Sequence, residues 1–246
     1  MGGTGVRLKD ETVVVTGGGS GIGRAVADAC VREGARVAVV GRDRGKLESV
    51  AGASAFVADA TVEADVERAC GEIVGRFGGV DVLVNNAGSA ESAPLGKTDR
   101  ALWERMFAAN ATSGFLMSRA LAPELVKRKG RIVFVASMAG KSGAAYIAAY
   151  AASKHAALGL MRSLAAEFAE RGVRVNAVCP GYVDTPMTER SVANIVARTG
   201  KDAAAVRETL AQMNPQKRLI KPEEVADAVV RLASRECMAT GQAVDL

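Results

Sequence analysis

Short apolar runs alternate with helix-favouring segments along the whole chain, and this alternation constrains the fold more than any other feature. The runs are rich in valine and bounded by glycine or polar residues, which is typical of strands buried on both faces of a sheet. They occupy residues 12–15, 36–40, 55–58, 80–84, 132–136 and 173–179, with a closing edge strand at 242–244. The strand-then-helix order predicts an α/β fold with a doubly wound parallel sheet and helices on both faces.

The length of 246 residues fits one large domain, so we predict a single domain over residues 1–246. The sequence has no run of about 18 apolar residues, as a membrane helix would need. Its N-terminus lacks the charged, apolar and small-residue pattern of a signal peptide. We therefore expect a soluble, cytoplasmic protein without a membrane partner, and we expect residues 1–5, which are small and polar, to fray.

Composition argues against several classes of site. The four cysteines lie far apart in the sequence and form no Cys-x-x-Cys pair, so we predict neither a metal site nor a disulfide framework. His155 is the only histidine, which excludes a Ser-His-Asp triad with a separately placed histidine. The net charge of +5 is spread along the chain without basic blocks, so we expect no nucleic-acid partner. That charge would suit an anionic cofactor or substrate.

A glycine-rich loop joins the first predicted strand to a helix that runs to about residue 33. Glycines permit a tight turn, and the free N–H groups and positive dipole end of a helix favour a pyrophosphate. Many glycine loops are only turns, but the setting between a strand and a helix favours a dinucleotide site. The residues predicted to bind this cofactor are Thr16, Gly17, Gly19, Ser20, Gly21, Ile22 and Gly23.

The ends of the next strands offer further cofactor contacts. The second strand ends at Gly41, and Arg42 follows where an acidic residue would bind the ribose of NAD. A guanidinium suits a 2′-phosphate, so we predict NADP(H) as the preferred cofactor and NAD(H) as the alternative, while a solvated loop arginine is the other interpretation. Asp59 could accept a hydrogen bond from the adenine amino group, or it could be a helix N-cap. Asn86, Ala87 and Gly88 follow the fourth strand, where they could fix the loop and let its backbone approach the cofactor.

The segment from Ser137 to Lys154 carries the predicted chemistry. Tyr150 and Lys154 are four residues apart in an Ala-rich helical segment, so their side chains share one face, and Ser137 lies at the carboxyl end of a buried strand. A free phenol has a pKa near ~10, and a nearby lysine would lower the pKa of Tyr150. Ser137 could hold a substrate oxygen by hydrogen bonding. A solvated Tyr-Lys surface pair is the alternative interpretation.

Two other stretches bear on the site. A long helical stretch over residues 99–129 contains Asn110 and Gly114, which are poor mid-helix residues and predict a kink, with a tolerated surface Asn as the alternative. Residues 182–221 form a long connection with helical spacing at 191–198 and 203–213, which we interpret as a substrate lid. Its many arginines and lysines would suit coenzyme A or acyl carrier protein, or they are a solvated helix face. Residues predicted to line the substrate pocket are Met138, Ala144, Ala145, Ile147, Tyr182 and Met187.

With these residues placed, the chain resembles the short-chain dehydrogenase/reductase family over essentially its full length. The matching motifs are Thr16-Gly-x-x-x-Gly21-x-Gly23, Asn85-Asn-Ala-Gly88, Asn110, Ser137, Tyr150-x-x-x-Lys154 and Pro180-Gly181. The resemblance implies a Rossmann-type fold, a nicotinamide cofactor, and a catalytic tetrad of Asn110, Ser137, Tyr150 and Lys154. It implies that Tyr150 is the acid/base, that Tyr150 and Lys154 contact the cofactor with Lys154 on the ribose, and that Asn110 anchors a proton-relay water.

The resemblance further implies cofactor contacts from Pro180, Gly181, Val183 and Thr185, and a homotetramer packed through the long helices and the closing strand. The chain departs from the family pattern at Ser20, where NADP-preferring members often carry a basic residue. It also ends at Asp245-Leu246, where members usually continue with Gly-Gly.

The predicted function is an NAD(P)-dependent oxidoreductase that moves a hydride between nicotinamide and a carbonyl or secondary alcohol. The substrate class that the resemblance favours is a 3-oxoacyl or 3-hydroxyacyl thioester. Alternatives are a reductase of a polyketide, steroid, sugar or xenobiotic ketone, and a non-catalytic NADP-binding regulator. The Tyr150 and Lys154 pair argues against the regulator, because a pure binder does not need it.

Overall fold

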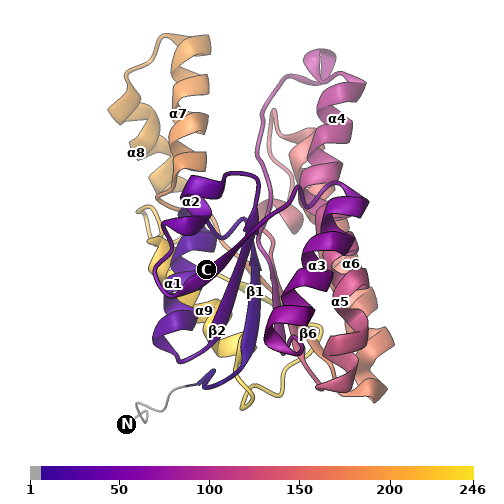
Figure 1. The fold of residues 1–246 in the computed structure, drawn as a ribbon. Coiled ribbons are helices and arrows are strands. Elements are labelled where there is room, and N and C mark those ends of the chain that lie inside the picture. Colours follow the sequence, from indigo (N-terminus) through magenta and orange to yellow (C-terminus); the bar gives the residue numbers. More distant parts are fainter. Residues whose placement is uncertain (1–6) are drawn as a thin grey trace.

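A seven-stranded sheet forms the centre of the protein in the computed structural model, which describes residues 7–246 (Figure 1). All neighbouring strands pair in parallel, in the order β3-β2-β1-β4-β5-β6-β7, which confirms the predicted doubly wound sheet. The predicted fraying of residues 1–5 lies outside the described residues. The strands are β1 Thr12–Thr16, β2 Arg36–Gly41, β3 Ala53–Val57, β4 Val82–Asn85, β5 Arg131–Val135, β6 Arg174–Cys179 and β7 Ala243–Asp245.

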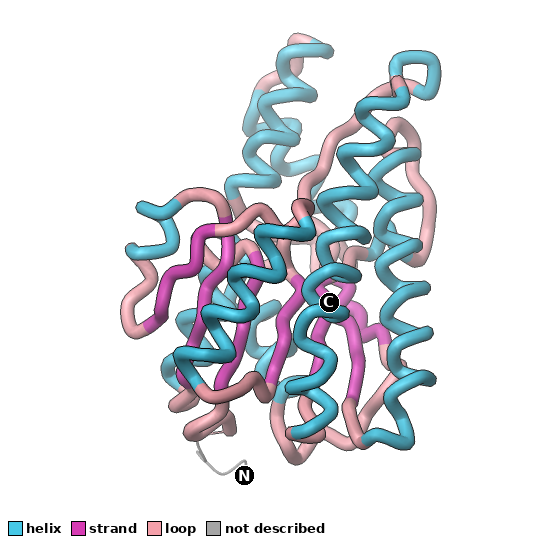
Figure 2. The backbone as a smooth tube through the Cα atoms, turned by 45° about the vertical axis from the view of Figure 1, so that its right-hand side comes forward, coloured by secondary structure: helices cyan, strands magenta, loops and turns pink. Residues whose placement is uncertain are grey.

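Helices cover both faces of this sheet, as Figures 1 and 2 show. The helices α3, α5 and α6 lie on one face, and α1 and α9 lie on the other. Side chains alternate between the faces along each strand, so Val14 packs under the first layer while Val13 and Val15 pack under the second. The helices are α1 Gly21–Arg32, α2 Arg44–Glu48, α3 Glu63–Phe77, α4 Arg100–Phe107, α5 Ser113–Lys127, α6 Ala148–Phe168, α7 Pro186–Thr199, α8 Ala203–Met213 and α9 Pro222–Ala233.

The predicted kink near Asn110 is a π-helical turn over Ala108–Thr112, which divides the expected long helix into α4 and α5. Asn110 is buried, with 6% of its surface exposed, so the alternative of a surface asparagine is wrong. The short helix α2 was not predicted. The first lid helix, α7, begins at Pro186 rather than at residue 191, because the Thr185 hydroxyl caps its N-terminus and proline favours the first helical position.

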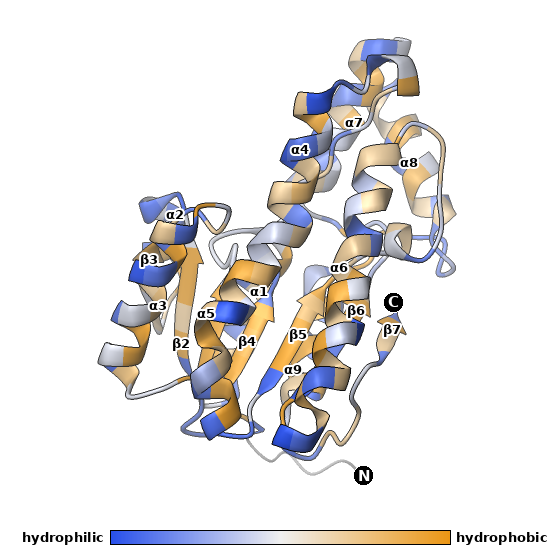
Figure 3. Cartoon of the chain, turned by 90° about the vertical axis from the view of Figure 1, so that its right-hand side faces the viewer, coloured by the Kyte–Doolittle hydropathy of each residue, from blue (hydrophilic) through white to orange (hydrophobic). Residues whose placement is uncertain are grey.

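The predicted lid, residues 182–221, leaves the sheet after β6 and returns before α9. Its two helices stand beyond the carboxyl ends of the strands (Figures 1 and 3), and Figure 1 shows them apart from α4. The two ends of this excursion are joined by a bridge between Val183 and Ile220 and by Asn214, whose side chain hydrogen-bonds the backbone N–H and C=O of Tyr182 at 2.8 Å each. The two ends of the predicted lid are therefore fastened to each other.

Among the helices of residues 7–246, none is long and apolar enough to cross a membrane.

Candidate active site

The four residues of the expected tetrad come from three elements that meet at the carboxyl edge of the sheet. Ser137 follows β5, Tyr150 and Lys154 lie in the first turns of α6, and Asn110 lies in the π turn before α5. A methyl group built on Gly88 would lie 2.6 Å from the Asn110 Oδ1 atom and 3.6 Å from the Lys154 Nζ atom. The loop after β4 thus passes directly over both side chains.

The Asn110 side chain is fully engaged inside the protein. Its Oδ1 atom accepts a hydrogen bond from the Ser89 N–H at 3.0 Å, and its Nδ2 group donates to the Ser89 carbonyl at 2.9 Å and to Ser153 Oγ at 3.0 Å. Ser153 Oγ in turn donates to the Tyr150 carbonyl at 2.7 Å. Asn110 therefore joins the loop after β4 to the first turn of α6.

Sequence reasoning missed Ser89 and Ser153. Ser153 is completely buried, and a polar residue next to Lys154 in an Ala-rich helix was a signal that could have identified it. Ser89 carried no such signal, because its contribution comes from its backbone.

Lys154 is buried, with 6% of its surface exposed, and its Nζ group donates to the Val135 carbonyl at 3.1 Å. Nζ lies 5.9 Å from the centroid of the Tyr150 ring. Burial lowers the pKa of Lys154 to about 8, because the ammonium form loses solvation.

Burial raises the pKa of the Tyr150 phenol, a hydrogen bond with Ser137 opposes the rise, and nearby Tyr182 adds to it. The sequence predicted that Lys154 would lower this pKa. In the structure the pKa is raised instead, because desolvation of the phenolate outweighs the other influences. Tyr150 is therefore a protonated phenol at neutral pH.

The glycine-rich loop after β1 is held by the loop after β4. Thr16 Oγ1 accepts hydrogen bonds from the backbone N–H groups of Asn86 and Ala87 at 3.0 and 2.9 Å. The Asn86 side chain donates to the Thr16 carbonyl at 2.8 Å and to the Gly17 carbonyl at 3.4 Å. Asn86 and Ala87, predicted as cofactor contacts, thus also fix the shape of the loop.

This loop fits a dinucleotide pyrophosphate. A Cβ atom at Gly23 would lie 2.2 Å from the Gly17 carbonyl oxygen, so only glycine lets α1 begin so close to the turn. Ser20 is the N-cap of α1, but its side chain caps no N–H group within residues 7–246, and the first turn carries no acidic residue. The N–H groups and positive end of α1 therefore remain available to an anion.

Arg42 lies just past β2 with 81% of its side chain exposed, and its Nη1 atom is 3.7 Å from Asp59 Oδ2. Asp59 also accepts hydrogen bonds from the Thr61 backbone and hydroxyl at 2.9 and 2.7 Å. The N-cap of α3 is Val62, so the alternative of Asp59 as an N-cap is wrong. A contact of Asp59 with adenine stays a prediction.

The segment after β6 faces the glycine loop. A Cβ atom at Gly21 would lie 3.4 Å from Thr185 Cγ2, while Thr185 Oγ1 caps α7 by accepting from the Thr188 N–H at 3.4 Å. The Pro180 carbonyl accepts from the Met138 N–H at 3.0 Å, which ties this segment to the residue after Ser137. Gly181 and Val183 lie between these two points.

The predicted substrate residues lie in two segments, the loop between β5 and α6 and the segment after β6. Ala144 and Ala145 are exposed, and Met138 and Ile147 are half-buried, in the loop that leads into α6. Met187 is half-buried on α7. Tyr182 packs against the lid's own apolar cluster of Val192, Val206 and Leu210. The assignment of these six residues to a substrate pocket stays a prediction.

Comparison with known proteins decides the family. The short chain dehydrogenase model matches residues 11–196. The chain belongs to this family. It is 43% identical over 238 residues to 2-(S)-hydroxypropyl-CoM dehydrogenase 3 of Xanthobacter autotrophicus, covering 93% of this chain and 91% of that protein. It is 33% identical to the 3-oxoacyl-[acyl-carrier-protein] reductase of Thermotoga maritima, covering 98% of each.

A solved structure gives the same result. A tryptophan variant of the actinorhodin polyketide ketoreductase, solved with NADPH, superposes with a TM-score of 0.92 and 32% sequence identity, covering 96% of this chain and 95% of the other. The chain is thus a short-chain dehydrogenase that binds a nicotinamide cofactor and acts on CH–OH or C=O groups. The varied substrates of these relatives leave its own substrate open.

The lowered pKa of Lys154 predicts a pH-dependent stability. The folded protein binds the Lys154 proton more weakly than the unfolded chain does, so burying the charged lysine destabilises the fold. This destabilisation is complete below about pH 8 and disappears as the pH rises toward 10.5. Compared with Lys154→Met, the wild type should gain unfolding free energy on the order of 3 kcal/mol across this range, measured by urea denaturation. Lys127→Met, at an exposed lysine, serves as the control. A wild-type minus K154M difference that stays constant with pH would contradict this assignment.

Proposed function

We propose that this protein is an NADP(H)-preferring oxidoreductase in which Tyr150 exchanges the proton while a hydride moves between nicotinamide and a ketone or secondary alcohol. The observation that carries the proposal is the meeting of Ser137, Tyr150 and Lys154 at the sheet edge beside a loop that fits a pyrophosphate. When bound, the nicotinamide cofactor supplies or accepts the hydride. The residues proposed to hold it are those predicted from the sequence.

Each side chain has a role that its surroundings support. The protonated Tyr150 donates its proton to the substrate oxygen during reduction, and Ser137 hydrogen-bonds the same oxygen and the phenol. In the direction of alcohol oxidation Tyr150 must first lose its proton, so higher pH favours that direction. Lys154 holds ribose hydroxyls through its buried Nζ group, and Asn110 keeps the first turn of α6 and the loop at Ser89 in register.

Tyr150→Phe tests the proton-transfer role. The variant should bind NADPH with unchanged affinity and should lose single-turnover hydride transfer by about 100-fold or more, because the phenylalanine cannot donate a proton. NADPH binding is measured by fluorescence and hydride transfer by rapid-mixing absorbance. Tyr146→Phe, whose side chain is 65% exposed, is the matched control and should retain the wild-type rate. Full activity in Y150F would refute the assignment.

The cofactor preference is proposed from Arg42. Its guanidinium is exposed just past β2, and its partner Asp59 lies at 3.7 Å, so it can turn toward a 2′-phosphate. The NADPH bound to the polyketide ketoreductase supports the same preference. Ser20 does not contribute to it, because a hydroxyl supplies no positive charge.

Arg42→Asp should lower the ratio of kcat/KM for NADPH to kcat/KM for NADH by about 10- to 100-fold, because a charge-assisted contact to phosphate is replaced by repulsion. The two cofactors are compared in steady-state assays with one ketone. Arg44→Asp, two residues away and paired with Glu48, is the control that should keep the ratio. An unchanged ratio in R42D would remove the support for NADP(H).

For the substrate we propose a 3-oxoacyl or 3-hydroxyacyl thioester, carried by coenzyme A or acyl carrier protein. The relatives that act on 3-oxoacyl-carrier-protein and polyketide substrates support this class. Other ketones and a non-catalytic regulator remain the alternatives, and the pairing of half-buried Tyr150 with buried Lys154 argues against the regulator. We also propose a cytoplasmic protein, which its four free cysteines support.

We further propose a homotetramer packed through the long helices and β7. Apolar side chains are exposed on these elements: Phe115 on α5 is 44% exposed, Trp103 on α4 is 43% exposed, and Val244 on β7 is 38% exposed. A methyl group at Gly159 on α6 would have nothing within 4 Å in the described part of the chain, so this helix can receive another closely. Such patches are typical of interfaces.

Phe115→Glu should convert the tetramer into smaller species, because a charge buried in an apolar interface costs solvation. Light scattering coupled to size-exclusion chromatography measures the mass. Lys127→Glu, an exposed position at the other end of α5, is the control that should keep the mass of the wild type. A wild type that elutes as a monomer would contradict the proposal.

A further inference from the structure

A cavity of about 580 Å³ opens between the loop after β4, the start of α4 and the end of α7. Two residues of its wall, Ala93 and Leu102, belong to a small apolar cluster that also contains Ala149 and is packed against by Tyr150. The Ala93 N–H donates to the Tyr146 carbonyl at 2.7 Å, which fastens this wall to the loop before α6. The cavity is therefore one layer of side chains from the proposed proton donor.

The lid contributes one cation to this cavity. Arg198, near the end of α7, reaches across to the loop after β4, where its Nη1 atom donates to the Ser92 carbonyl at 2.7 Å. Because Arg198 and Ser92 are 106 residues apart, this contact depends on the folded position of the lid. A hydrogen bond to a neutral carbonyl leaves the positive charge of the guanidinium without a counter-charge.

The carboxylates of the cavity are already engaged. Glu91 lies 3.3 Å from Arg105 Nη2, and Asp99 caps α4 by accepting from the Leu102 N–H at 2.7 Å. Within residues 7–246, neither Arg198 nor Lys97 forms an ion pair. The wall therefore holds three cations (Lys97, Arg105 and Arg198) against two carboxylates (Glu91 and Asp99), so a net positive charge remains after the Glu91–Arg105 pair and the charge of Asp99 are counted.

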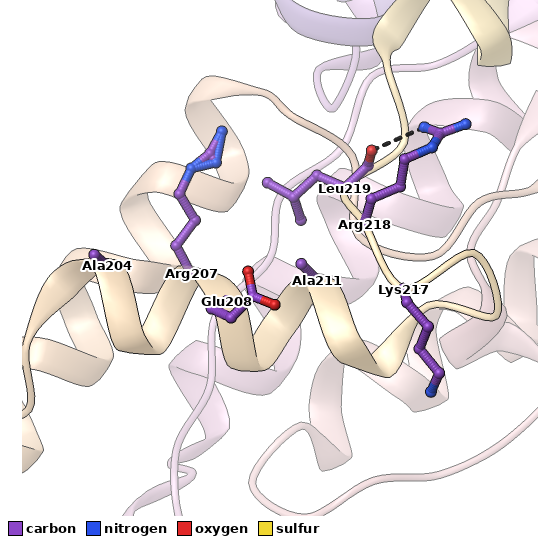
Figure 4. Close-up of a pocket in the computed structure, with 7 residues that line it drawn as sticks. All are labelled: Ala204, Arg207, Glu208, Ala211, Lys217, Arg218 and Leu219. Carbon is purple, nitrogen blue, oxygen red and sulfur yellow. Dashed lines mark hydrogen bonds between the residues drawn. The ribbon is translucent and has the colours of Figure 1, made fainter.

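A second hollow, within residues 182–221, differs in the pairing of its arginines. It measures about 340 Å³ between α8 and the segment that follows (Figure 4). Arg207 there lies 2.6 Å from Asp184, and Arg218 binds both carboxylate oxygens of Glu224 at 2.6 and 2.7 Å. Arg218 also donates to the Leu219 carbonyl, as Figure 4 shows. Both arginines of this hollow are neutralised by carboxylates within the protein, and Lys217 on the same wall donates to the Gln212 carbonyl at 2.9 Å. Arg198 in the first cavity differs from these arginines because it has no carboxylate partner among the described residues.

We infer that Arg198, assisted by Lys97, binds an anionic group on the tail of the substrate, so that this protein selects ketones or alcohols carrying a phosphate or sulfonate. The inference rests on the proposed function, since it names the substrate class of the same site. The shared chemistry is a tetrahedral oxyanion, which the planar guanidinium fork binds through two parallel N–H groups. The phosphates of a coenzyme A thioester are one source, and the sulfonate of a thioethanesulfonate is the other.

Matched substrates test this. Acetoacetyl-CoA and the acetoacetyl thioester of N-acetylcysteamine share one ketone, but only the first carries phosphates. An oxopropyl thioethanesulfonate and the oxopropyl ethyl thioether form the corresponding sulfonate pair. In Arg198→Gln the KM for the anionic member of one pair should rise about 10- to 100-fold, with its neutral partner unchanged. The substrate pair in which only the anionic member shows a raised KM identifies whether the bound anion is a phosphate or a sulfonate.

Arg100→Gln is the control, since Arg100 lies on α4 outside the cavity wall and is paired with Glu104 at 2.6 Å. It should leave both KM values unchanged. Arg198→Lys keeps the charge without the fork and should give an intermediate KM. Equal losses for anionic and neutral members in R198Q, or no loss for any, would overturn the inference.

A binding measurement separates this inference from the proposed function. Calorimetry with the protein saturated with NADP⁺ measures the affinity for acetoacetyl-CoA and for the oxopropyl thioethanesulfonate. Binding that weakens in R198Q supports the anion site, even if neither compound is turned over, in which case only the proposed function fails. Absence of binding of both compounds to the wild type overturns the anion site.

Discussion

The Thr16 hydroxyl, which accepts hydrogen bonds from the N–H groups of both Asn86 and Ala87, joins two loops at the point where the strand order of the sheet reverses. A doubly wound sheet opens a crevice at this reversal, between the carboxyl ends of β1 and β4. The bonds from Thr16 and from the Asn86 side chain keep the two loops at a fixed spacing. The N-terminus of α1 and the loop that passes over Lys154 therefore keep a fixed position relative to each other.

A second polar junction lies deeper in the site. The π turn at Ala108–Thr112 turns Asn110 into the protein interior, where its amide joins Ser89 to Ser153. Because every polar group of this amide has a partner, its burial costs little, whereas a half-satisfied network would be destabilising. The position of Tyr150 on α6 thus depends on the π turn between α4 and α5, through Asn110 and Ser153. This explains why a disruption in the helix pattern marks a functional site.

Much of this architecture could be predicted from local patterns. The strands were predictable because valine-rich runs bounded by turns are short-range signals, and Tyr150 and Lys154 because spacing by four is geometry within one helix. The contacts of Asn110 with Ser89 and Ser153 were not, since they join residues that are 21 and 43 positions apart, although Ser153 itself stood out as a polar residue in an Ala-rich helix. The direction of the Tyr150 pKa shift was predicted wrongly, because burial by neighbouring elements is a tertiary property. The start of α7 was misplaced because its cap, Thr185, was interpreted only as a cofactor contact.

The closed base of the excursion over residues 182–221 has a consequence for how such a protein can diversify. Val183 and Ile220 pair with each other, and Asn214 fastens the chain at Tyr182, so both ends of the excursion share one anchor. The segment between Val183 and Asn214, which contains α7 and α8, can lengthen, shorten or change its charge without displacing β6 or α9. Substrate specificity can therefore change through this segment during evolution while Ser137, Tyr150 and Lys154 keep their positions.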